Sequence, residues 1–436
     1  MPEALEIALT PERLDEGSPE ERACFGVFSV RSGLTELTAG LDYFTSGYRL
    51  GPLVSGYHAA EWFAWNWWRL RFEPRSTAQD WWRAHKMTAI GEGYSWPNLT
   101  IYSDGFRTVL LAKPSSQPDA KPFRYLGANP VVVPSVEFEA ALDAFIPRII
   151  GRLREQGLLE TNLNRIWRDV LAERADAEMS RRRRLEALLA RGADEIEDGA
   201  VEGLVADAAS LGEGAVEELA AERAQGGALM TAEGLEQTAT NSGVDAAPRD
   251  AVKLGREAHL PSPRDAPPWR LGSLAARALR AQQRMGGEPI SSERLARMAG
   301  VQTVALSKEA ASASLSFALD RNAAQGRVVL RSRWETGRRF DLARLLADRL
   351  VIPTEGRLHA ATRAYTYRQK MQRSFAAELL SPFEAVDAML AGDYSSEAQA
   401  EAAEYFRVSP LTILTLLVNH KRLEREELDE DIGVAA

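Results

Sequence analysis

The sequence predicts an α+β protein that is mostly helical and carries a small antiparallel sheet near its N-terminus. Apolar residues recur at helical spacing in many stretches, most clearly at residues 52–70. The strongest strand signal is at residues 98–113, where two alternating runs flank Asp104-Gly105, a dipeptide that favours a two-residue hairpin turn. Residues 225–269 collect glycine, serine, aspartate and five prolines, which is the composition of a linker. These observations indicate several domains joined by a connecting segment.

The chain is 436 residues long, which is enough for two or three domains. From the composition we place boundaries where helical or strand patterns give way to acidic or proline-rich stretches. The expected parts are a tryptophan-rich α+β domain at 1–190, an acidic helical connector with a proline-rich linker at 191–275, a C-terminal domain at 276–425 and an acidic tail at 426–436.

Cysteine content and hydropathy predict a cytoplasmic protein. The single cysteine, Cys24, excludes an internal disulfide and agrees with a reducing compartment. No apolar run approaches the roughly 20 residues that span a bilayer, and the N-terminus carries acids rather than a signal segment. We therefore expect no membrane partner.

The N-terminal domain is expected to combine short strands with helices. A strand at 23–30 places Cys24 as a small buried residue, and Val131, Val132 and Val133 form another strand signal. Helices are predicted at 52–70, 135–156 and 161–191, the first beginning near Pro52 because proline suits a first helical turn.

Seven tryptophans lie within 35 residues of this domain. Such a concentration indicates a tightly packed aromatic core, and a stacking platform for nucleic-acid bases is the alternative. Few basic residues separate the tryptophans, which favours the core. The seven are Trp62, Trp65, Trp67, Trp68, Trp81, Trp82 and Trp96.

The same region contains a candidate pocket. His58 and Glu61 share one helical face, and with His85 they would bind a metal ion if two helices crossed at the right point. Capped or core histidines are the alternative. The residues of this candidate pocket are His58, Glu61, Trp62, Asn66 and His85.

Charge is distributed unevenly along the chain. Residues 192–250 hold 14 acidic residues against 2 arginines, whereas residues 277–349 hold 14 basic residues against 7 acidic ones. The basic segment is suited to nucleic acid, to an acidic partner or to the chain's own acidic middle. If it binds nucleic acid, the candidate contacts are Arg327, Arg331, Arg333, Arg338 and Arg339.

Two C-terminal segments carry a family resemblance. RRFDLARLLADRL at 338–350 and QRSFAAELLSP at 372–382 resemble the ImmA/IrrE family of bacterial zinc metallopeptidases, whose two helices read roughly RRFTLAHELGH and EANxFAAELLMP. The resemblance covers residues 285–425 and implies a zincin-like, mostly helical domain with a short sheet.

The resemblance also implies that the catalytic residues are missing. The two zinc-binding histidines of the family fall on Arg344 and Asp348, its catalytic glutamate on Leu345, and its third ligand near Met371. None of these positions suits zinc, so we expect no cofactor and no peptidase activity. Residues three and four apart share a helix face, so we expect an ion-pair ladder of Asp341, Arg344 and Asp348 in place of the metal.

The function expected from these observations is non-catalytic regulation or protein interaction on a metal-free peptidase frame. Active members of the ImmA/IrrE family act in stress responses and mobile-element control. The resemblance therefore suggests a similar setting for this protein, including phage defence. A protein partner is expected, bound in the groove that a peptidase would use. The alternatives are nucleic-acid binding through the arginines or the tryptophans, and an enzyme whose site lies in the N-terminal domain.

Overall fold

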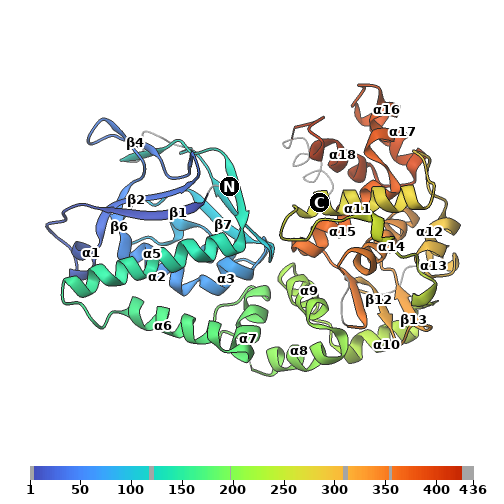
Figure 1. Ribbon diagram of the computed structural model, residues 1–436, viewed down its shortest axis with the longest axis horizontal. Helices are drawn as coiled ribbons and strands as arrows, with labels where there is room; N and C mark the ends of the chain where they lie inside the picture. The colour runs from blue at the N-terminus through green and yellow to red at the C-terminus, as the bar shows by residue number, and fades with distance from the viewer. Residues whose placement is uncertain (1–3, 117–121, 197, 308–312, 353–355, 425–436) are drawn as a thin grey trace. The chain divides into compact units, whose positions relative to one another are not determined.

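The computed structural model describes residues 4–116, 122–196, 198–307, 313–352 and 356–424. The chain forms a mixed α+β fold with several small antiparallel sheets, as the sequence predicted. It divides into two compact units (Figure 1), namely unit 1, residues 1–202 with 223–226 and 364–366, and unit 2, residues 203–222, 227–363 and 367–436. The expected acidic tail at 426–436 lies outside the described residues.

The described residues of unit 1 form three small antiparallel sheets. The four-stranded sheet has β1 (Leu5–Pro11), β2 (Phe25–Ser32), β3 (Thr35–Glu36) and β6 (Leu53–Ser55). A three-stranded sheet has β7 (Leu99–Ser103), β8 (Arg107–Ala112) and β10 (Pro130–Pro134), and another has β4 (Gly40–Asp42), β5 (Gly47–Arg49) and β9 (Phe123–Tyr125).

The predicted hairpin is present as β7 and β8, but its turn lies one residue later than expected. Asp104 N–H donates to the Arg107 carbonyl at 3.0 Å, so the two central residues are Gly105 and Phe106. Gly105 has a φ of +102°, which glycine adopts without strain. The Asp104 carboxylate accepts from the Phe106 and Arg107 amides, which makes it the flank of the turn rather than its first central residue.

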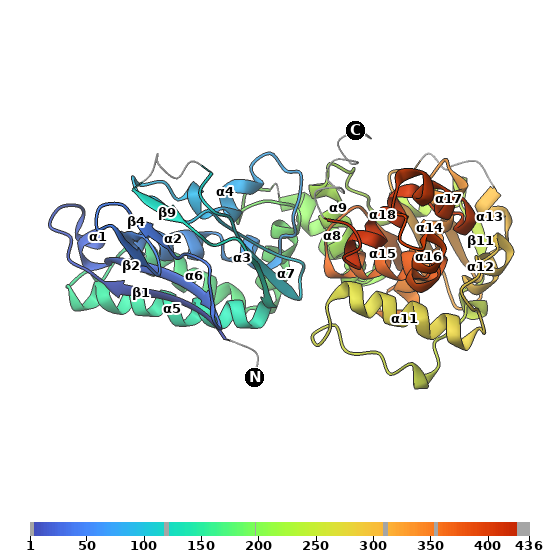
Figure 2. The same ribbon diagram turned by 90° about the horizontal axis from the view of Figure 1, so that it is seen from above.

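Helices cover these sheets, and α5 runs along β1 and β2 in Figure 1 and Figure 2. Their bounds are α1 (Pro19–Ala23), α2 (Gly56–Trp65), α3 (Trp67–Phe72), α4 (Trp81–His85), α5 (Ser135–Glu155), α6 (Asn162–Ala175) and α7 (Ala177–Leu188).

The helix expected at 52–70 is two helices, and it starts later than Pro52. Residues 53–55 pair with β2 as strand β6, and the Ser55 side chain caps the start of α2. Asn66 then ends α2, because its side-chain amide donates to the Trp62 carbonyl at 2.9 Å. Side-chain bonds of this kind compete with continued helix.

Most tryptophans of the cluster belong to the core of unit 1. Trp62, Trp67, Trp68 and Trp96 are buried in one hydrophobic cluster, whereas Trp65 is 72% exposed. Trp67 and Trp68 contact each other edge to face with ring centroids 4.7 Å apart. The structure thus supports the aromatic core for these four residues.

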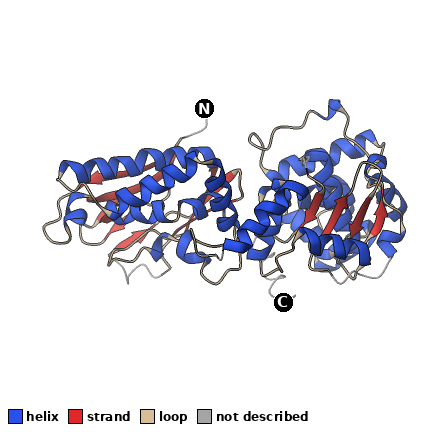
Figure 3. Cartoon of the chain, turned by 90° about the horizontal axis from the view of Figure 1, so that it is seen from below, coloured by secondary structure: helices blue, strands red, loops and turns tan. Residues whose placement is uncertain are grey.

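Unit 2 is built on a four-stranded antiparallel sheet in the order β11 (Val244–Ala246), β13 (Gly326–Val329), β12 (Ser316–Asp320) and β14 (Leu358–Ala361). Figure 3 shows helices on both faces of this sheet. Helix α14 contacts β12 and β14, and α10 contacts β12 and β13.

The helices of unit 2 and of its connection to unit 1 are α8 (Asp198–Leu211), α9 (Glu213–Ala224), α10 (Ala232–Ser242), α11 (Pro268–Gln282), α12 (Ser292–Met298), α13 (Val304–Ser307), α14 (Glu335–Val351), α15 (Tyr367–Leu380), α16 (Phe383–Leu390), α17 (Ser396–Phe406) and α18 (Pro410–Asn419). Ser291 and Ser409 cap α12 and α18, respectively. Among the described residues, none of these helices is long and apolar enough to cross a membrane.

The proline-rich segment expected to be a linker is part of unit 2. Its residues 244–246 form strand β11, and the Ala247 amide donates to the Gly300 carbonyl at 2.8 Å. Further along, the Ala266 carbonyl accepts from the Tyr367 hydroxyl at 2.7 Å. Long-range hydrogen bonds therefore attach this segment to unit 2, which linker composition alone does not reveal.

Helices α11 and α15 pack closely because of a glycine. A Cβ atom added at Gly272 would lie 2.3 Å from the Met371 carbonyl oxygen and 2.8 Å from the Phe375 nitrogen. Near the C-terminal end of α11, the buried Arg280 guanidinium donates to the carbonyls of Leu379 and Glu288. Helix α14 contacts both α11 and α15, so this close pair also supports α14.

Replacing Gly272 by alanine tests this packing. An interior helix glycine normally costs roughly 0.5–1 kcal/mol relative to alanine, so Gly272→Ala would stabilise an isolated helix. Here the added Cβ would clash with the backbone of α15, so Gly272→Ala should instead lower the free energy of unfolding of unit 2. Chemical denaturation measures this change. Gly203→Ala in α8 is the matched control, since its Cβ meets no described atom within 4 Å. Equal stabilisation by both substitutions would contradict the close contact.

Candidate functional site

A row of polar side chains on helix α14 points into the interior of unit 2. Asp341, Arg344 and Asp348 are 8%, 5% and 1% exposed, respectively. Leu345 and Met371, the other two positions implied by the resemblance, are buried in the hydrophobic core. The positions expected to replace the zinc site therefore hold two apolar residues and a buried set of charges.

The Asp348 carboxylate is the centre of this set. Arg368 donates to it twice, from Nε to Oδ1 at 2.5 Å and from Nη2 to Oδ2 at 3.0 Å. Gln372 Nε2 donates to Oδ1 at 2.7 Å, and His359 Nδ1 lies 2.9 Å from Oδ2. One carboxylate of α14 thereby joins β14 and α15.

A second carboxylate extends the network to β12. His359 Nε2 lies 3.6 Å from Asp320 Oδ2, and Arg349 donates to both oxygens of Asp320 at 2.7 and 2.6 Å. Acidic and basic groups thus alternate from Arg368 through Asp348, His359 and Asp320 to Arg349. We refer to these five residues as the Asp348 network.

The network changes the proton affinities of its members. Burial alone would raise the pKa of Asp348, but the Arg368 charge and the hydrogen bond with His359 outweigh it and lower the pKa to about 2. Burial would lower the pKa of His359, yet hydrogen bonds with Asp320 and Asp348 raise it above its ordinary value. The network thus favours an ionised Asp348 and a protonated His359.

Only half of the expected ladder is present. Arg344 Nη1 lies 3.4 Å from Asp341 Oδ1, which is the expected pair three residues apart. Arg344 does not continue to Asp348: its Nη2 donates to the Thr362 carbonyl at 2.5 Å and to Gln369 Oε1 at 2.6 Å. Helix α15 supplies better-placed partners for both residues, so the Arg344–Asp348 pair was a wrong expectation.

Gln369 and Gln372 of α15 flank the third position, Met371. The structure shows that their amides also hold the edge strand, since both donate to the Ala360 carbonyl, at 3.0 and 3.1 Å. The Thr362 amide donates to Gln369 Oε1 at 2.9 Å. Two buried atoms, Arg344 Nε and Gln372 Oε1, have no hydrogen-bond partner among the described residues.

The side chains at this place do not fit a zinc ion. Asp348, His359 and Asp320 lie in a row, but each carboxylate is bound to an arginine that would repel a cation. Within the described ranges, no three His, Cys, Asp or Glu side chains are arranged to hold a metal ion. The network can therefore cross-link the fold, but it offers no site for metal-assisted hydrolysis.

The candidate N-terminal pocket is not assembled. His58 Nε2 lies 3.5 Å from Glu21, whereas Glu61 accepts from the hydroxyl of Tyr57 at 3.1 Å. Trp62 and Asn66 bind backbone carbonyls, those of Arg83 and Trp62, respectively. Each of these side chains has a local structural partner, which argues against a shared metal or catalytic site.

His85 belongs to a separate buried group that the sequence did not predict. Its Nε2 lies 3.0 Å from Glu73 Oε2, its Nδ1 lies 2.7 Å from the Ile101 carbonyl, and Trp81 stacks on its ring. Arg69 Nε donates to the same Glu73 oxygen at 2.6 Å. The spacing of Arg69 and Glu73, four residues apart, was the available signal. This group links α3, α4 and β7 within the core.

Two of the five candidate nucleic-acid contacts are unavailable. Arg338 and Arg339 are buried, and their guanidinium groups donate to carbonyls such as those of Leu306 and Ile290. The other three arginines are less buried, and each has a contact with a neighbouring residue. Arg327 pairs with Asp245 at 3.2 Å, Arg331 donates to the Ser314 carbonyl, and the exposed Arg333 stacks on Trp334.

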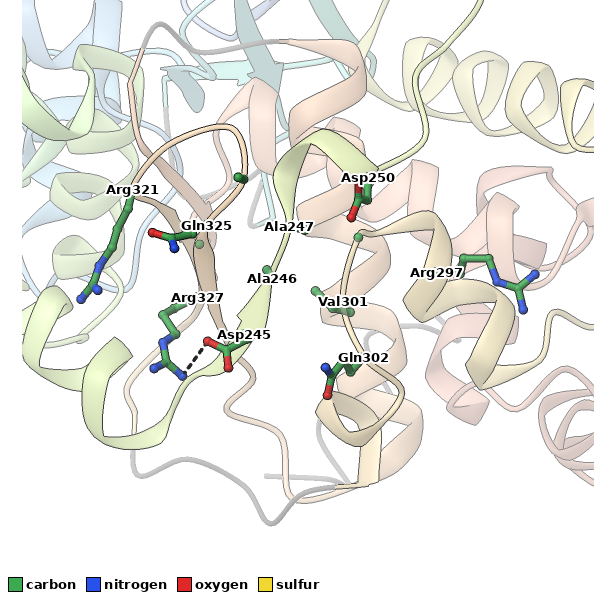
Figure 4. A pocket seen from close by; sticks show the side chains of 13 residues that line it. Asp245, Ala246, Ala247, Asp250, Arg297, Val301, Gln302, Arg321, Gln325 and Arg327 are labelled. Atoms are coloured by element: carbon green, nitrogen blue, oxygen red, sulfur yellow. Dashed lines mark ion pairs between the residues drawn. The ribbon is translucent and has the colours of Figure 1, made fainter.

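A cavity of about 630 Å³ lies beside strand β11 and the turn between β12 and β13 (Figure 4). Strand β11, the turn at Arg321–Gly326 and the residues after α12 line it, and Arg327 and Asp245 form an ion pair at its wall. The cavity adjoins the Asp320 end of the Asp348 network, since a Cβ atom added at its lining residue Gly326 would lie 2.8 Å from Asp320 Oδ1. It combines arginines with aspartates, so its charge favours no single ligand class.

Comparison of the chain with protein-family models, curated proteins and solved structures finds no match in any of the three. The resemblance to the ImmA/IrrE family therefore stays a prediction.

Replacing Asp348 by asparagine tests the importance of the network. Asp348→Asn leaves Arg368 buried without its counter-charge, and removing one partner of a buried ion pair costs about 3–5 kcal/mol. We expect the free energy of unfolding of unit 2 to fall by about 3–5 kcal/mol, as measured by chemical denaturation. Asp245→Asn is the control. It breaks the ion pair of Asp245 with Arg327, in which the aspartate is 80% exposed, and it should lower the free energy of unfolding by only a small fraction of that amount. Similar costs for both would contradict the account.

The raised pKa of His359 predicts a pH dependence. Protonated His359 stabilises the folded state below its unfolded pKa of about 6.5, and this contribution is lost as the pH rises through the higher folded value. The difference in unfolding free energy between the wild type and His359→Gln should therefore be largest below about pH 6.5 and narrow towards alkaline pH. A difference that widens as the pH rises would show that His359 is held neutral.

Proposed function

We propose that the protein is a non-catalytic regulatory or interaction protein, and that unit 2 is a metal-free, ImmA/IrrE-like frame that binds another protein. The observation that carries this proposal is the bidentate contact of Arg368 with Asp348 at the position where the resemblance implies a zinc ligand. A guanidinium at this place supplies the positive charge that zinc would supply, but it cannot polarise a peptide carbonyl as a Lewis acid does.

The neighbouring residues support the same conclusion. Leu345 stands where the resemblance implies the catalytic glutamate, and its side chain is 2% exposed within the core. General-base catalysis needs a group that reaches a water or a substrate proton, and an aliphatic side chain offers none. Met371 contributes only apolar packing at the third position.

The structure also bears on how a partner would bind. Adding a strand to a sheet edge requires unpaired backbone groups along that edge. At β14, the last strand of the sheet, the Ala360 carbonyl already accepts from Gln369 and Gln372. A partner is therefore expected to bind through side chains rather than as an additional strand at Ala360.

The biological setting in this proposal follows from the resemblance alone. It includes bacterial stress response, mobile-element control and phage defence. The cytoplasmic location in this proposal follows instead from the single cysteine and the hydropathy of the sequence. In each setting, a frame that holds a protein segment without cutting it would act by sequestering that segment or by positioning it.

Metal content and proteolysis test the proposal. Full-length protein from zinc-supplemented cells should contain far less than one zinc per chain by mass spectrometry, and a copurifying protein partner should stay intact. Stoichiometric zinc that is lost in His359→Ala but retained in His420→Ala would overturn the proposal, as would cleavage of the partner. His420 is the matched control because it stacks on Phe383, away from the network.

A further inference from the structure

The small sheet β5–β4–β9 of unit 1, whose strands β4 and β9 are labelled in Figure 2, has one buried and one exposed face. Asp42 and Phe123 lie on the buried face and are 6% and 4% exposed, respectively. On the other face, Leu41 pairs with Tyr48 of β5 and with Arg124 of β9. Residues directly opposite each other share a face of the sheet, so these three side chains form a row across the outer face.

Backbone hydrogen bonds extend this face beyond the strands. The Tyr43 amide donates to the Pro122 carbonyl at 3.0 Å, and the Leu126 amide donates to the Ala39 carbonyl at 3.0 Å. Because side chains alternate along a strand, Tyr43 and Leu126 share the outer face with the row. The exposed apolar and aromatic members of this face are Leu41, Tyr43, Tyr48 and Leu126.

The turn between β4 and β5 is held in shape by one carboxylate. Asp42 Oδ1 accepts from the Phe44 and Thr45 amides at 2.9 and 3.2 Å, and Asp42 Oδ2 pairs with Arg49 at 2.9 Å. The turn presents Phe44 to solvent, with 86% of the residue exposed. A turn that is ordered before binding lowers the conformational entropy lost when a ligand binds.

The aromatic rings of this face are open to a ligand. Among the described residues, Tyr43, Phe44 and Tyr48 stack on no other ring, and neither tyrosine hydroxyl has a hydrogen-bond partner. A cluster of exposed apolar and aromatic side chains on a folded protein marks a binding surface more often than single exposed residues do.

The charge of the same face is a single cation. Arg124 is exposed, and its guanidinium has no hydrogen-bond or ion-pair partner in the part of the chain that the structure describes. Asp42 is the one acidic residue of the three strands, and it is bound to Arg49 on the opposite face. Tyr43 and Arg124 are diagonal neighbours on adjacent strands, which places their Cα atoms about 7–8 Å apart. The face therefore offers open rings beside a free positive charge.

We propose that this surface, which we call the aromatic face and which consists of Leu41, Tyr43, Phe44, Tyr48 and Arg124, binds single-stranded nucleic acid. Unpaired bases stack on the three rings, and a phosphate binds the guanidinium. Every base has a flat π-face, so stacking of this kind is tolerant of sequence. The bases of a duplex already stack on their neighbours and are not free to lie on a sheet. The inference concerns unit 1 and goes beyond the protein partner proposed for unit 2.

The charge of the face distinguishes this ligand from other occupants. A neutral apolar partner would bury Arg124 without a counter-charge, which is unfavourable. A second copy of the same face would bring no carboxylate to Arg124, because the outer side of these strands carries none. A peptide supplies an anion only at its acidic residues, whereas every nucleotide carries both a flat base and a phosphate.

A single arginine predicts a weak dependence of binding on salt. For single strands, the logarithm of the binding constant falls with the logarithm of the salt concentration by about 0.7 for each phosphate that the protein neutralises. The aromatic face should therefore give a slope near about −0.7. Binding through the basic segment of unit 2 would involve several arginines and give a slope several times steeper.

Fluorescence anisotropy with the full-length protein tests the proposal, using labelled oligouridine and oligothymidine of about twelve nucleotides. The wild type should bind a single strand more tightly than a duplex of equal length. Tyr48→Ala should weaken binding roughly five- to hundredfold through the loss of one stacked base, and Tyr48→Phe should retain most of the affinity. Trp65→Ala removes an exposed ring from helix α2 and should bind as the wild type does. Tighter binding of oligouridine would identify RNA as the ligand, and tighter binding of oligothymidine would identify DNA.

Arg124→Ala should weaken binding and flatten its salt dependence, and Arg124→Lys should restore part of both. The proposal would be overturned by a wild type that binds neither oligonucleotide, by equal binding of the wild type and Tyr48→Ala, or by a duplex that binds as tightly as a single strand. A slope steeper than about −3 would place the binding at the basic segment instead. Self-association that Tyr48→Ala abolishes, with oligonucleotide binding unchanged, would assign the face to a second copy of the chain.

Discussion

The buried carboxylate of Asp348 is the constraint on which unit 2 depends. Three side chains from two other elements converge on it, namely His359 of β14 and Arg368 and Gln372 of α15. Through His359 the same network reaches Asp320 of β12. A single charge on α14 thereby fixes the sheet edge and the neighbouring helix, which is the cross-linking role that a structural metal plays in other proteins.

The uneven charge of the sequence is resolved within the fold. Asp245 and Glu236 lie in the acidic middle of the chain, and they pair with Arg327 and Arg321 of the basic segment. Other basic residues are buried and bind backbone carbonyls, as Arg339 does. Part of the apparent basic character is therefore used internally, which weakens the case for nucleic acid at this segment.

Local signals in the sequence were sufficient for many elements but not for the site. The helix predicted at 135–156 is present as α5, and alternation around Asp104-Gly105 predicted β7 and β8. The partner of Asp348 could not be chosen in the same way, because Arg368 and His359 are 20 and 11 residues away and only the packing of α15 and β14 on α14 brings them together. Strand β11 was missed for a similar reason, since its pairing with β13 is long-range.

Titration of the His359 ring by nuclear magnetic resonance tests the central claim most directly. The account predicts a midpoint above about 6.5, because two carboxylates face the ring, and it predicts that added zinc leaves the titration unchanged. A midpoint at or below the ordinary value, or a curve that zinc displaces, would contradict a self-contained ionic network at Asp348.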